Sequence, residues 1–118
     1  MKIALVVGFA ITTIPLYIFA DPSIKMQEYI RIAQAFQEQK DLDKAILYNK
    51  KALECNENHI ESLFNVGNLY YYQGNYTESV RFYKKAVDVH PESSAILSNM
   101  ALALDNLGEY DECISALE

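Results

Sequence analysis

The chain has 118 residues, of which 51% are hydrophobic and 22% charged, with a formal net charge of -6. These figures exclude a disordered or collagen-like chain and leave room for one domain at most. A chain this acidic repels the phosphate backbone of a nucleic acid, which proteins bind through Lys and Arg that displace counterions. We therefore expect no nucleic-acid partner.

The first predicted element is an apolar segment over residues 3–20 that contains no charged residue. Lys2 precedes it, Pro15 interrupts it and Ala20 closes it, which is the layout of a secretory signal peptide, residues 1–20, cleaved after Ala20. Eighteen residues at about 1.5 Å each also span most of a ~30 Å hydrocarbon core, so an uncleaved membrane anchor is the alternative. We expect the protein to be exported (periplasmic or secreted) or anchored to a membrane by this segment.

After a short lead-in over residues 21–25, a pattern that starts at Met26 starts again at Ile60 and at Ser94, with a constant period and no gaps. Its three copies cover residues 26–59, 60–93 and 94–118, the third being truncated. The eighth and twentieth positions of every copy hold small residues: Ala33, Ala45, Gly67, Ser79, Ala101 and Cys113. Small side chains at fixed positions indicate two amphipathic helices that cross closely in each copy. The predicted fold is all-α, an antiparallel helix-pair solenoid of about two and three-quarter repeats.

The middle copy predicts one helix over residues 60–73 and a second over residues 76–89. Gly74 lies between them and is free to adopt a positive φ, which stops a helix. The same register predicts turns between copies over residues 49–58 and 89–94. In the third copy we expect a second helix that begins at Tyr110 and ends after about two and a half turns, which leaves an open edge.

The middle copy resembles the tetratricopeptide repeat at nearly all of its signature positions: Leu63, Val66, Gly67, Tyr70, Gly74, Tyr76, Ser79, Tyr83, Ala86 and Pro91. The first copy departs more, because Lys40 replaces the turn glycine and Glu57 the terminal proline. The resemblance extends over residues 26–118. It implies a superhelix whose inner wall is formed by the first helix of each copy, and a role in binding a protein or an extended peptide.

The resemblance also implies which residues face the groove. The candidate peptide-binding residues are Arg31, Gln34, Phe64, Asn65, Asn68, Tyr72 and Asn99, with Glu61, Tyr71, Ser98 and Leu102 beside them. An Asn amide offers a donor and an acceptor to a peptide backbone, and aromatic rings offer flat apolar contact. The alternative is that these Asn side chains bind no ligand and only expose polar groups to water on the wall of the groove. Capture of a terminal carboxylate is not expected, because Ile30 and Ala95 stand where that role needs Lys.

No arrangement typical of catalysis or metal binding is present in the sequence. His59 and His90 fall in predicted turns, and neither has a second His or Cys at the spacing of a zinc site. Acidic residues gather near the predicted turns as helix caps and first-turn charges: Asp41, Asp43, Asp105, Glu109, Asp111 and Glu112. Cys55 and Cys113 are expected to remain reduced, with Cys113 buried. We expect no metal, no cofactor and no enzymatic activity.

The sequence therefore predicts a non-enzymatic interaction scaffold that binds a peptide or protein segment in its concave groove. The alternative is a structural or assembly subunit. Such a subunit would self-associate, or dock in a membrane complex, through its open C-terminal edge.

Overall fold

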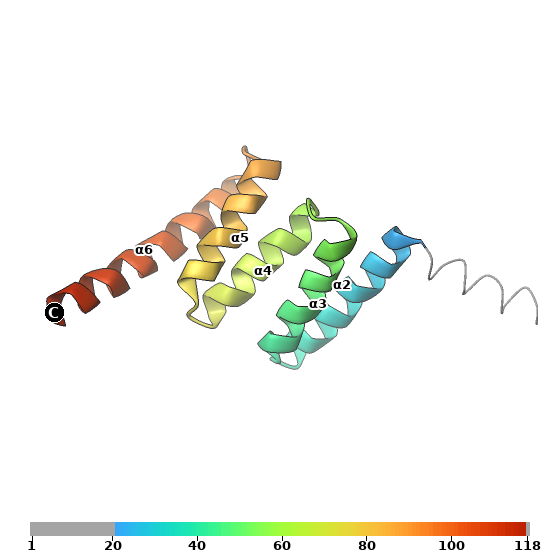
Figure 1. Ribbon diagram of the computed structural model, residues 1–118, viewed down its shortest axis with the longest axis horizontal. Coiled ribbons are helices and arrows are strands. Elements are labelled where there is room, and N and C mark those ends of the chain that lie inside the picture. Colours follow the sequence, from blue (N-terminus) through green and yellow to red (C-terminus); the bar gives the residue numbers. More distant parts are fainter. Residues whose placement is uncertain (1–20, 118) are drawn as a thin grey trace, which may run out of the picture.

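The computed structural model describes the backbone of residues 21–117 and the side chains of residues 21–108. This part consists of five α-helices and short turns: α2 (Pro22–Glu38), α3 (Leu42–Cys55), α4 (Ile60–Tyr72), α5 (Tyr76–Val89) and α6 (Ser94–Leu117). Each helix packs mainly against its neighbours in sequence, and the helices form a single row (Figure 1). The predicted all-α helix-pair solenoid is confirmed. The predicted signal or anchor segment, residues 1–20, lies outside the described residues.

The second helix of each pair begins at a side chain that caps its free backbone N–H groups. Asp41 accepts a hydrogen bond from the Lys44 N–H, with an O–N distance of 3.2 Å. Asn75, at the same position of the next copy, accepts one from the Glu78 N–H at 3.4 Å. Because the first N–H groups of a helix have no partner within it, these caps fix where α3 and α5 start. The predicted role of Asp41 as a cap is confirmed.

The turns α2–α3 and α4–α5 share one backbone geometry. In both, the N–H of the capping residue bonds the carbonyl five residues earlier at 2.9 Å, Asp41 to Phe36 and Asn75 to Tyr70. The residue before each cap adopts a left-handed conformation, with φ 79° at Gly74 and 62° at Lys40. Glycine adopts this conformation without steric cost, whereas a side chain such as that of Lys40 does so under strain.

The prediction of a turn over residues 49–58 is wrong. Helix α3 continues to Cys55, and the turn occupies only residues 56–59. Asn49 fits inside the helix because its Nδ2 donates to the carbonyl of the residue four positions earlier, at 3.0 Å. The fully buried Ala52 then continues the buried face of the helix beyond Asn49. An Asn side chain that bonds within its own helix does not mark a turn.

The prediction of a separate second helix from Tyr110 is also wrong, because α6 is unbroken through Gly108. Asp105, which we expected beside a turn, lies exposed within this helix. If the chain turned out of the helix at Gly108, intrahelical hydrogen bonds would be lost. In the first two copies the packing of a complete second helix compensates for that loss. Continuing the helix through residues 109–117 satisfies their backbone groups locally.

The predicted small residues lie where the helices of a pair cross. Gly67 faces the ring of Tyr83, and a Cβ placed on Gly67 would lie 2.5 Å from the Tyr83 Cε1. The Ser79 Oγ, from the same helix as Tyr83, donates to the Gly67 carbonyl at 2.7 Å. In the first pair, Ala33 and Ala45 are 1% and 0% exposed. Close helix crossing is therefore confirmed for the first two copies.

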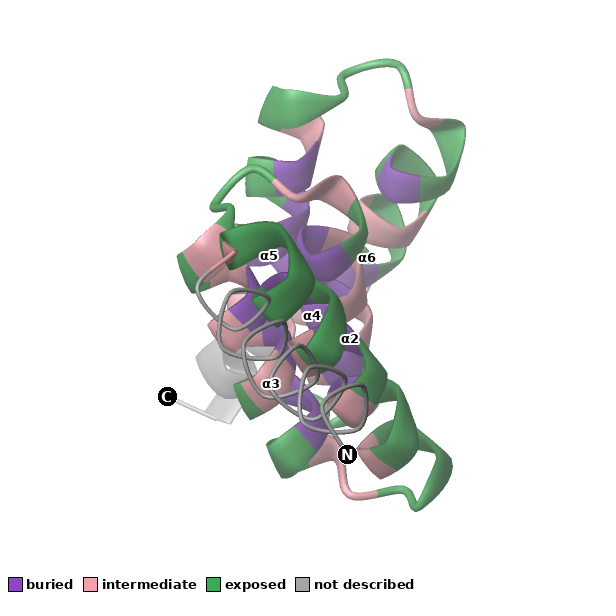
Figure 2. Cartoon of the chain, turned by 90° about the vertical axis from the view of Figure 1, so that its right-hand side faces the viewer, coloured by how far each residue is buried: buried purple, intermediate pink, exposed green. Residues whose placement is uncertain are grey.

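The hydrophobic core is centred on α4 and α5. Its most buried members on these two helices are Leu63, Val66, Leu69, Val80, Phe82, Tyr83 and Ala86. Ala45 and Ile46 of α3 and Ile96 and Ala103 of α6 extend this core on either side. Buried positions gather where the helices face one another, and the turns are exposed (Figure 2). A smaller cluster of Met26, Ile30 and Ala52 joins α2 to α3.

Two side-chain hydrogen bonds join the first copy to the second. The Lys50 Nζ donates to the Tyr70 hydroxyl at 2.6 Å and lies 5.1 Å from the centre of the same ring. The Gln73 Nε2 donates to an Asp43 carboxylate oxygen, also at 2.6 Å. Contact between α3 and α4 is thus polar as well as apolar, as is typical of a solenoid whose copies contact only their neighbours.

Candidate functional site

The predicted groove residues lie on the first helix of each pair, which are α2, α4 and α6. Arg31 and Gln34 lie on α2, Phe64, Asn65, Asn68 and Tyr72 on α4, and Asn99 on α6. Arg31, Gln34 and Tyr72 are exposed, whereas the other four are partly buried. The structure distributes these seven residues between two separate hollows and the surfaces beside them.

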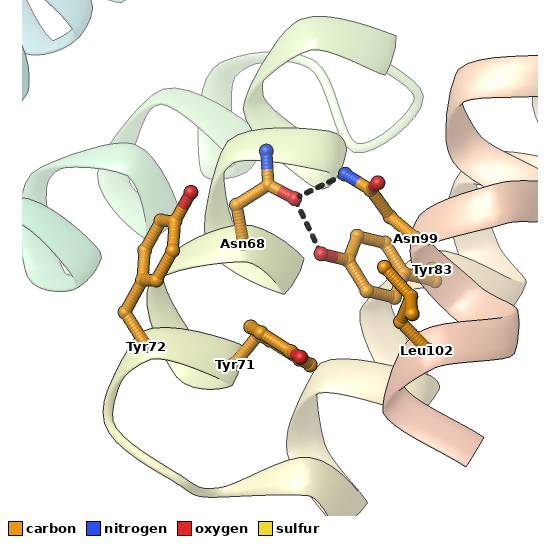
Figure 3. A pocket seen from close by; sticks show the side chains of 6 residues that line it. All are labelled: Asn68, Tyr71, Tyr72, Tyr83, Asn99 and Leu102. Atoms are coloured by element: carbon orange, nitrogen blue, oxygen red, sulfur yellow. Dashed lines mark hydrogen bonds between the residues drawn. The ribbon is translucent and has the colours of Figure 1, made fainter. Parts of the chain in front are cut away.

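The first hollow lies between α4 and α6 and has a volume of about 120 Å³. Its lining comprises Asn68, Tyr71, Tyr72, Tyr83, Asn99 and Leu102 (Figure 3). Three of the predicted residues, Asn68, Tyr72 and Asn99, therefore come together here. Tyr71 and Leu102, which we expected beside them, complete the wall, and Leu102 contributes an apolar side chain that is 53% exposed.

A hydrogen-bond network fixes the amide of Asn68 in one orientation. The Asn68 Oδ1 accepts one bond from the Asn99 Nδ2 at 3.0 Å and another from the Tyr83 hydroxyl. Both partners therefore lie on the oxygen side of the Asn68 amide. The Asn68 Nδ2 points away from both partners (Figure 3). The free donor of Asn68 therefore lies at the rim of the hollow, directed away from the other labelled residues (Figure 3).

Tyr83 reaches the hollow from α5, a second helix, and the sequence did not indicate it as a groove residue. Its ring crosses α4 at Gly67, where any larger residue would block it. The spacing between Gly67 and Tyr83 within one copy was the available signal. Burial raises the pKa of the Tyr83 hydroxyl above its ordinary value, although hydrogen bonds with neighbouring side chains lower it in part. At neutral pH Tyr83 is therefore a protonated donor to Asn68.

Aromatic side chains form the far wall of this hollow. Tyr71 lies edge-on to Tyr72 and Tyr76, with ring centroids 6.0 and 5.4 Å away. The Asn106 Nδ2 of α6 donates to the Tyr71 hydroxyl at 3.1 Å and so holds it against that helix. Tyr72 is 69% exposed, which leaves its ring free to contact a ligand.

The second hollow lies between α2 and α4 and is larger and more open, at about 660 Å³. It is lined by Gln34, Gln37, Glu38, Glu61 and Asn65, all polar or acidic. Gln34 and Asn65 are thus brought together, apart from the first hollow. This hollow offers hydrogen-bonding groups and negative charge without an aromatic wall.

Two of the predicted residues line neither hollow. Arg31 pairs with Glu28 one turn earlier on α2, at 3.1 Å, and both side chains are exposed. An exposed pair of this kind contributes little to stability, so the Arg31 side chain is held only loosely. Phe64 instead packs on the core, with its ring centroid 6.0 Å from that of Tyr83.

Groups suited to metal binding or membrane crossing are absent from the part of the chain that is described. In residues 21–108, no three His, Cys, Asp or Glu side chains gather as metal ligands would. His59 lies in the turn before α4, as predicted, and caps that helix: its ring Nδ1 lies 3.3 Å from the Ser62 backbone nitrogen. Cys55 is a free thiol, and the side chain of Cys113 lies outside the described part. Between residues 21 and 117, the helices are too short or too polar to cross a membrane.

Comparison with known protein families explains this arrangement. Family models of the tetratricopeptide repeat (TPR) match residues 29–59, 60–93 and 82–115. The chain belongs to the tetratricopeptide repeat family. Its coarse function follows from that membership, because TPR arrays are scaffolds for protein–protein interaction.

Three curated relatives of this TPR chain are partial matches. Photosystem I assembly protein Ycf3 of Prochlorococcus marinus is 30% identical over 96 residues, which are 79% of this chain and 56% of Ycf3. TPR repeat-containing thioredoxin TTL4 of Arabidopsis thaliana is 35% identical over 65 residues, 55% of this chain and 9% of TTL4. Protein O-mannosyl-transferase TMTC1 of Homo sapiens is 26% identical over 87 residues, 74% of this chain and 10% of TMTC1. The chain thus spans about half the length of Ycf3 and about a tenth of the other two.

Solved structures share the fold of this TPR chain. The C-terminal TPR-containing domain of a Plasmodium falciparum FK506-binding protein superposes with a TM-score of 0.69 at 24% identity, covering 77% of this chain and 60% of that domain. MamA (AMB-1) superposes with a TM-score of 0.67 at 18% identity, covering 80% of this chain and 51% of MamA. At these identities the likeness concerns the fold.

Proposed function

We propose that this TPR chain is a non-enzymatic scaffold that binds an extended peptide or protein segment across the hollow between α4 and α6. The observation that carries the proposal is the fixed orientation of Asn68. Its Oδ1 is occupied by Asn99 and Tyr83, so its Nδ2 is held ready to donate to a ligand. A donor held in place by the fold loses little conformational entropy on binding.

The two Asn side chains offer complementary groups to a peptide backbone. The Asn68 Nδ2 can donate to a peptide carbonyl. The Asn99 Oδ1, which accepts no hydrogen bond from the described residues, can accept from a peptide N–H. Because a peptide group carries both a carbonyl and an N–H, this recognition does not depend on the side chains of the partner. Selectivity for one partner over another must then come from the apolar wall formed by Tyr71, Tyr72 and Leu102.

The size of the hollow indicates what part of a ligand it takes. Pockets for drug-sized molecules have volumes of about 300–1,000 Å³, whereas this hollow has about 120 Å³. It is large enough for one apolar side chain between Tyr72 and Leu102. The rest of the partner would lie along the surface of the first helices. A segment of a protein therefore fits better than a small molecule.

The charge of the helices beside the hollow indicates which kinds of partner are favoured. Helix α4 has Glu61 and no basic residue, and the described part of α6 has Asp105 and no basic residue. Ile30, at a position where carboxylate capture would need Lys, is buried at 7% exposure. A neutral or basic segment is thus favoured over an acidic one, and a nucleic acid is disfavoured.

A second candidate function is suggested by one relative. Ycf3 is described as a photosystem I assembly protein and aligns with 79% of this chain. By analogy, this chain would hold a subunit during the assembly of a membrane complex, with residues 1–20 acting as an export signal or anchor. Mass spectrometry of the mature amino terminus tests the location: a start at Asp21 establishes cleavage, and an intact start at Met1 supports the anchor.

The groove proposal is tested by the substitution Asn68→Asp, which has nearly the same shape. Asp keeps an oxygen for Tyr83 and Asn99 but replaces the free donor with a second oxygen. Peptides selected from a random displayed library on the full chain are expected to bind the variant about tenfold or more weakly, because one hydrogen bond is lost and an acceptor faces a carbonyl. Binding is measured by isothermal titration calorimetry.

The matched control is Asn58→Asp, which makes the same chemical change at an exposed turn outside the groove. It is expected to leave the affinity unchanged. Equal binding by the Asn68 variant, or a library that yields no ligand, would refute binding at this hollow. Thermal unfolding of both variants shows whether the fold is preserved.

A further inference from the structure

The two hollows of this chain are the same place in successive copies of the repeat. Four of the five residues that line the second hollow have a counterpart, one repeat later, in the lining of the first. The pairs are Gln34 and Asn68, Gln37 and Tyr71, Glu38 and Tyr72, and Asn65 and Asn99. Each hollow therefore lies between the first helix of one copy and the first helix of the next.

The second hollow differs from the first in its charge. Glu38 stands where the first hollow has Tyr72, and Glu61, the other carboxylate of the lining, holds the position of Ala95 in the third copy. The remaining three lining residues are neutral amides, and none is basic. Among the residues that the structure describes, neither carboxylate has an ion-pair partner. The second hollow is therefore negative and rich in hydrogen-bond acceptors.

The nearby basic residue of α2, Arg31, does not compensate this charge. It holds the position in its copy that Asn65 and Asn99 hold in theirs, and both of these face the preceding first helix. Arg31 thus lies on the side of α2 away from α4, where it pairs with Glu28 at 3.1 Å. A cation that neutralises the hollow must come from a ligand.

A buried acceptor stands at the position that closes the first hollow. Tyr83 lines the first hollow from α5, and Asn49 of α3 is its counterpart in the first copy. Asn49 is 2% exposed; its Nδ2 donates to the Ala45 carbonyl, whereas its Oδ1 has no hydrogen-bond partner in the described chain. An unpaired buried acceptor costs free energy, so this position also favours a ligand that donates hydrogen bonds.

We propose that the second hollow binds a lysine or arginine side chain of the same partner segment that occupies the first hollow. Glu38 and Glu61 supply opposite charge, and the amide oxygens supply further acceptors for a group that only donates. An acidic side chain is repelled here, and an apolar one desolvates the carboxylates without a return. This inference rests on the proposed function, because the segment that brings the cation is the one bound at Asn68.

The separation of the hollows predicts a spacing within the partner. They lie on the two sides of α4, and neighbouring packed helices are on the order of 10 Å apart. An extended chain covers this distance in about three residues, and its side chains point alternately to opposite faces. The basic residue is therefore expected about two or four positions from the apolar residue that enters the first hollow.

A cycle of peptide and protein variants tests the pairing. A peptide selected from a random displayed library on the full chain is synthesised with arginine, and with citrulline, at the basic position. Citrulline has nearly the shape of arginine without its charge. The citrulline peptide is expected to bind the native chain about tenfold or more weakly in isothermal titration calorimetry. In the double variant Glu38→Gln with Glu61→Gln, the two peptides are expected to bind alike.

The matched control is Glu57→Gln with Glu92→Gln, which removes the same charge at exposed turns outside both hollows. It is expected to keep the full preference for arginine. Equal loss of this preference in both double variants would assign it to the overall charge of the chain and overturn the proposal. A peptide whose binding depends on Asn68 but does not distinguish arginine from citrulline would overturn this inference alone. A library without ligands would overturn the proposed function as well.

Nuclear magnetic resonance of the full chain shows where the cation binds. Addition of the arginine peptide is expected to shift the side-chain amide signals of the second hollow, which are those of Gln34, Gln37 and Asn65. The citrulline peptide is expected to shift mainly the signals of Asn68 and Asn99. Shifts confined to the first hollow with both peptides would overturn the proposal. Thermal unfolding of the double variants shows whether their fold is preserved.

Discussion

Helix α4 and helix α6 carry the same pattern of packing residues in different surroundings. On α4, Gly67 meets Tyr83 and Ser79 so closely that no side chain fits there. On α6, Ala101 stands at the same position of the repeat and is exposed. The pattern therefore determines which face of a helix can pack closely, whereas the presence of a partner helix determines whether it does.

The largest expected effect is on stability: a leucine at this position of the repeat should destabilise the fold in α4 but not in α6. Gly67→Leu should destabilise the fold by about 3 kcal/mol, because its side chain must displace the ring of Tyr83. Ala101→Leu should change the free energy of unfolding by less than about 0.5 kcal/mol in dilute solution. Urea denaturation followed by circular dichroism measures both. Similar losses at the two positions would mean that α6 is covered in the monomer.

A second comparison concerns the two turns, which share a backbone geometry but not a residue. Gly74→Ala should cost about 1 kcal/mol, because alanine must adopt a positive φ at 79°. Lys40→Gly should stabilise the first turn by about the same amount, because the strained residue there becomes glycine. Thermal unfolding measures both changes. A loss of stability in Lys40→Gly would show that the Lys40 side chain contributes more than its strain costs.

A smaller effect on stability separates the contribution of the Tyr83 hydroxyl from that of its ring. Tyr83→Phe keeps the ring on Gly67 but leaves the Asn68 Oδ1 with one donor fewer, at a cost of about 1 kcal/mol near neutral pH. Urea denaturation of the native chain and the variant measures the difference. Equal stability of the two would mean that the hydroxyl contributes nothing through Asn68.

The same hydroxyl should make stability depend on alkaline pH. Burial raises the pKa of Tyr83, so the neutral phenol is favoured in the folded state. Its contribution is complete below the ordinary tyrosine pKa of about 10 and is lost as the pH rises through the higher pKa of the folded state. Stability of the native chain should therefore fall more steeply above pH 10 than that of Tyr83→Phe. Parallel curves from pH 8 to 11 would contradict this assignment.

The sequence predicted the elements best where local and tertiary signals agree. Helices expected over residues 60–73 and 76–89 are observed as Ile60–Tyr72 and Tyr76–Val89, because capping, the turn glycine and apolar periodicity mark the same boundaries. In the third copy the repeat register predicted a second helix from Tyr110, and α6 instead continues through Gly108. A glycine permits a turn, but packing of the next helix is needed to stabilise it.

The candidate site was predicted in outline only. Asn68, Tyr72 and Asn99 meet in one hollow, as their positions in the repeat suggested. The contribution of Tyr83 to the lining of the hollow was missed, because its side chain reaches the groove from a second helix, across Gly67. The orientation of the Asn68 amide was also out of reach, since it depends on donors that lie on two other helices, far away in sequence.

The hydrogen bond between Asn68 and Asn99 gives the proposed groove a polarity. One wall donates and the other accepts, so the two helices are not equivalent to a bound strand. The carbonyl and N–H groups of a peptide alternate in a fixed order from its amino to its carboxyl end. In an extended strand successive peptide units alternate in direction, so a bound strand satisfies both walls when one unit turns its carbonyl toward Asn68 and its N–H toward Asn99. Only every second peptide unit has this orientation, so the two walls would restrict a bound strand to registers two residues apart while remaining tolerant of its sequence.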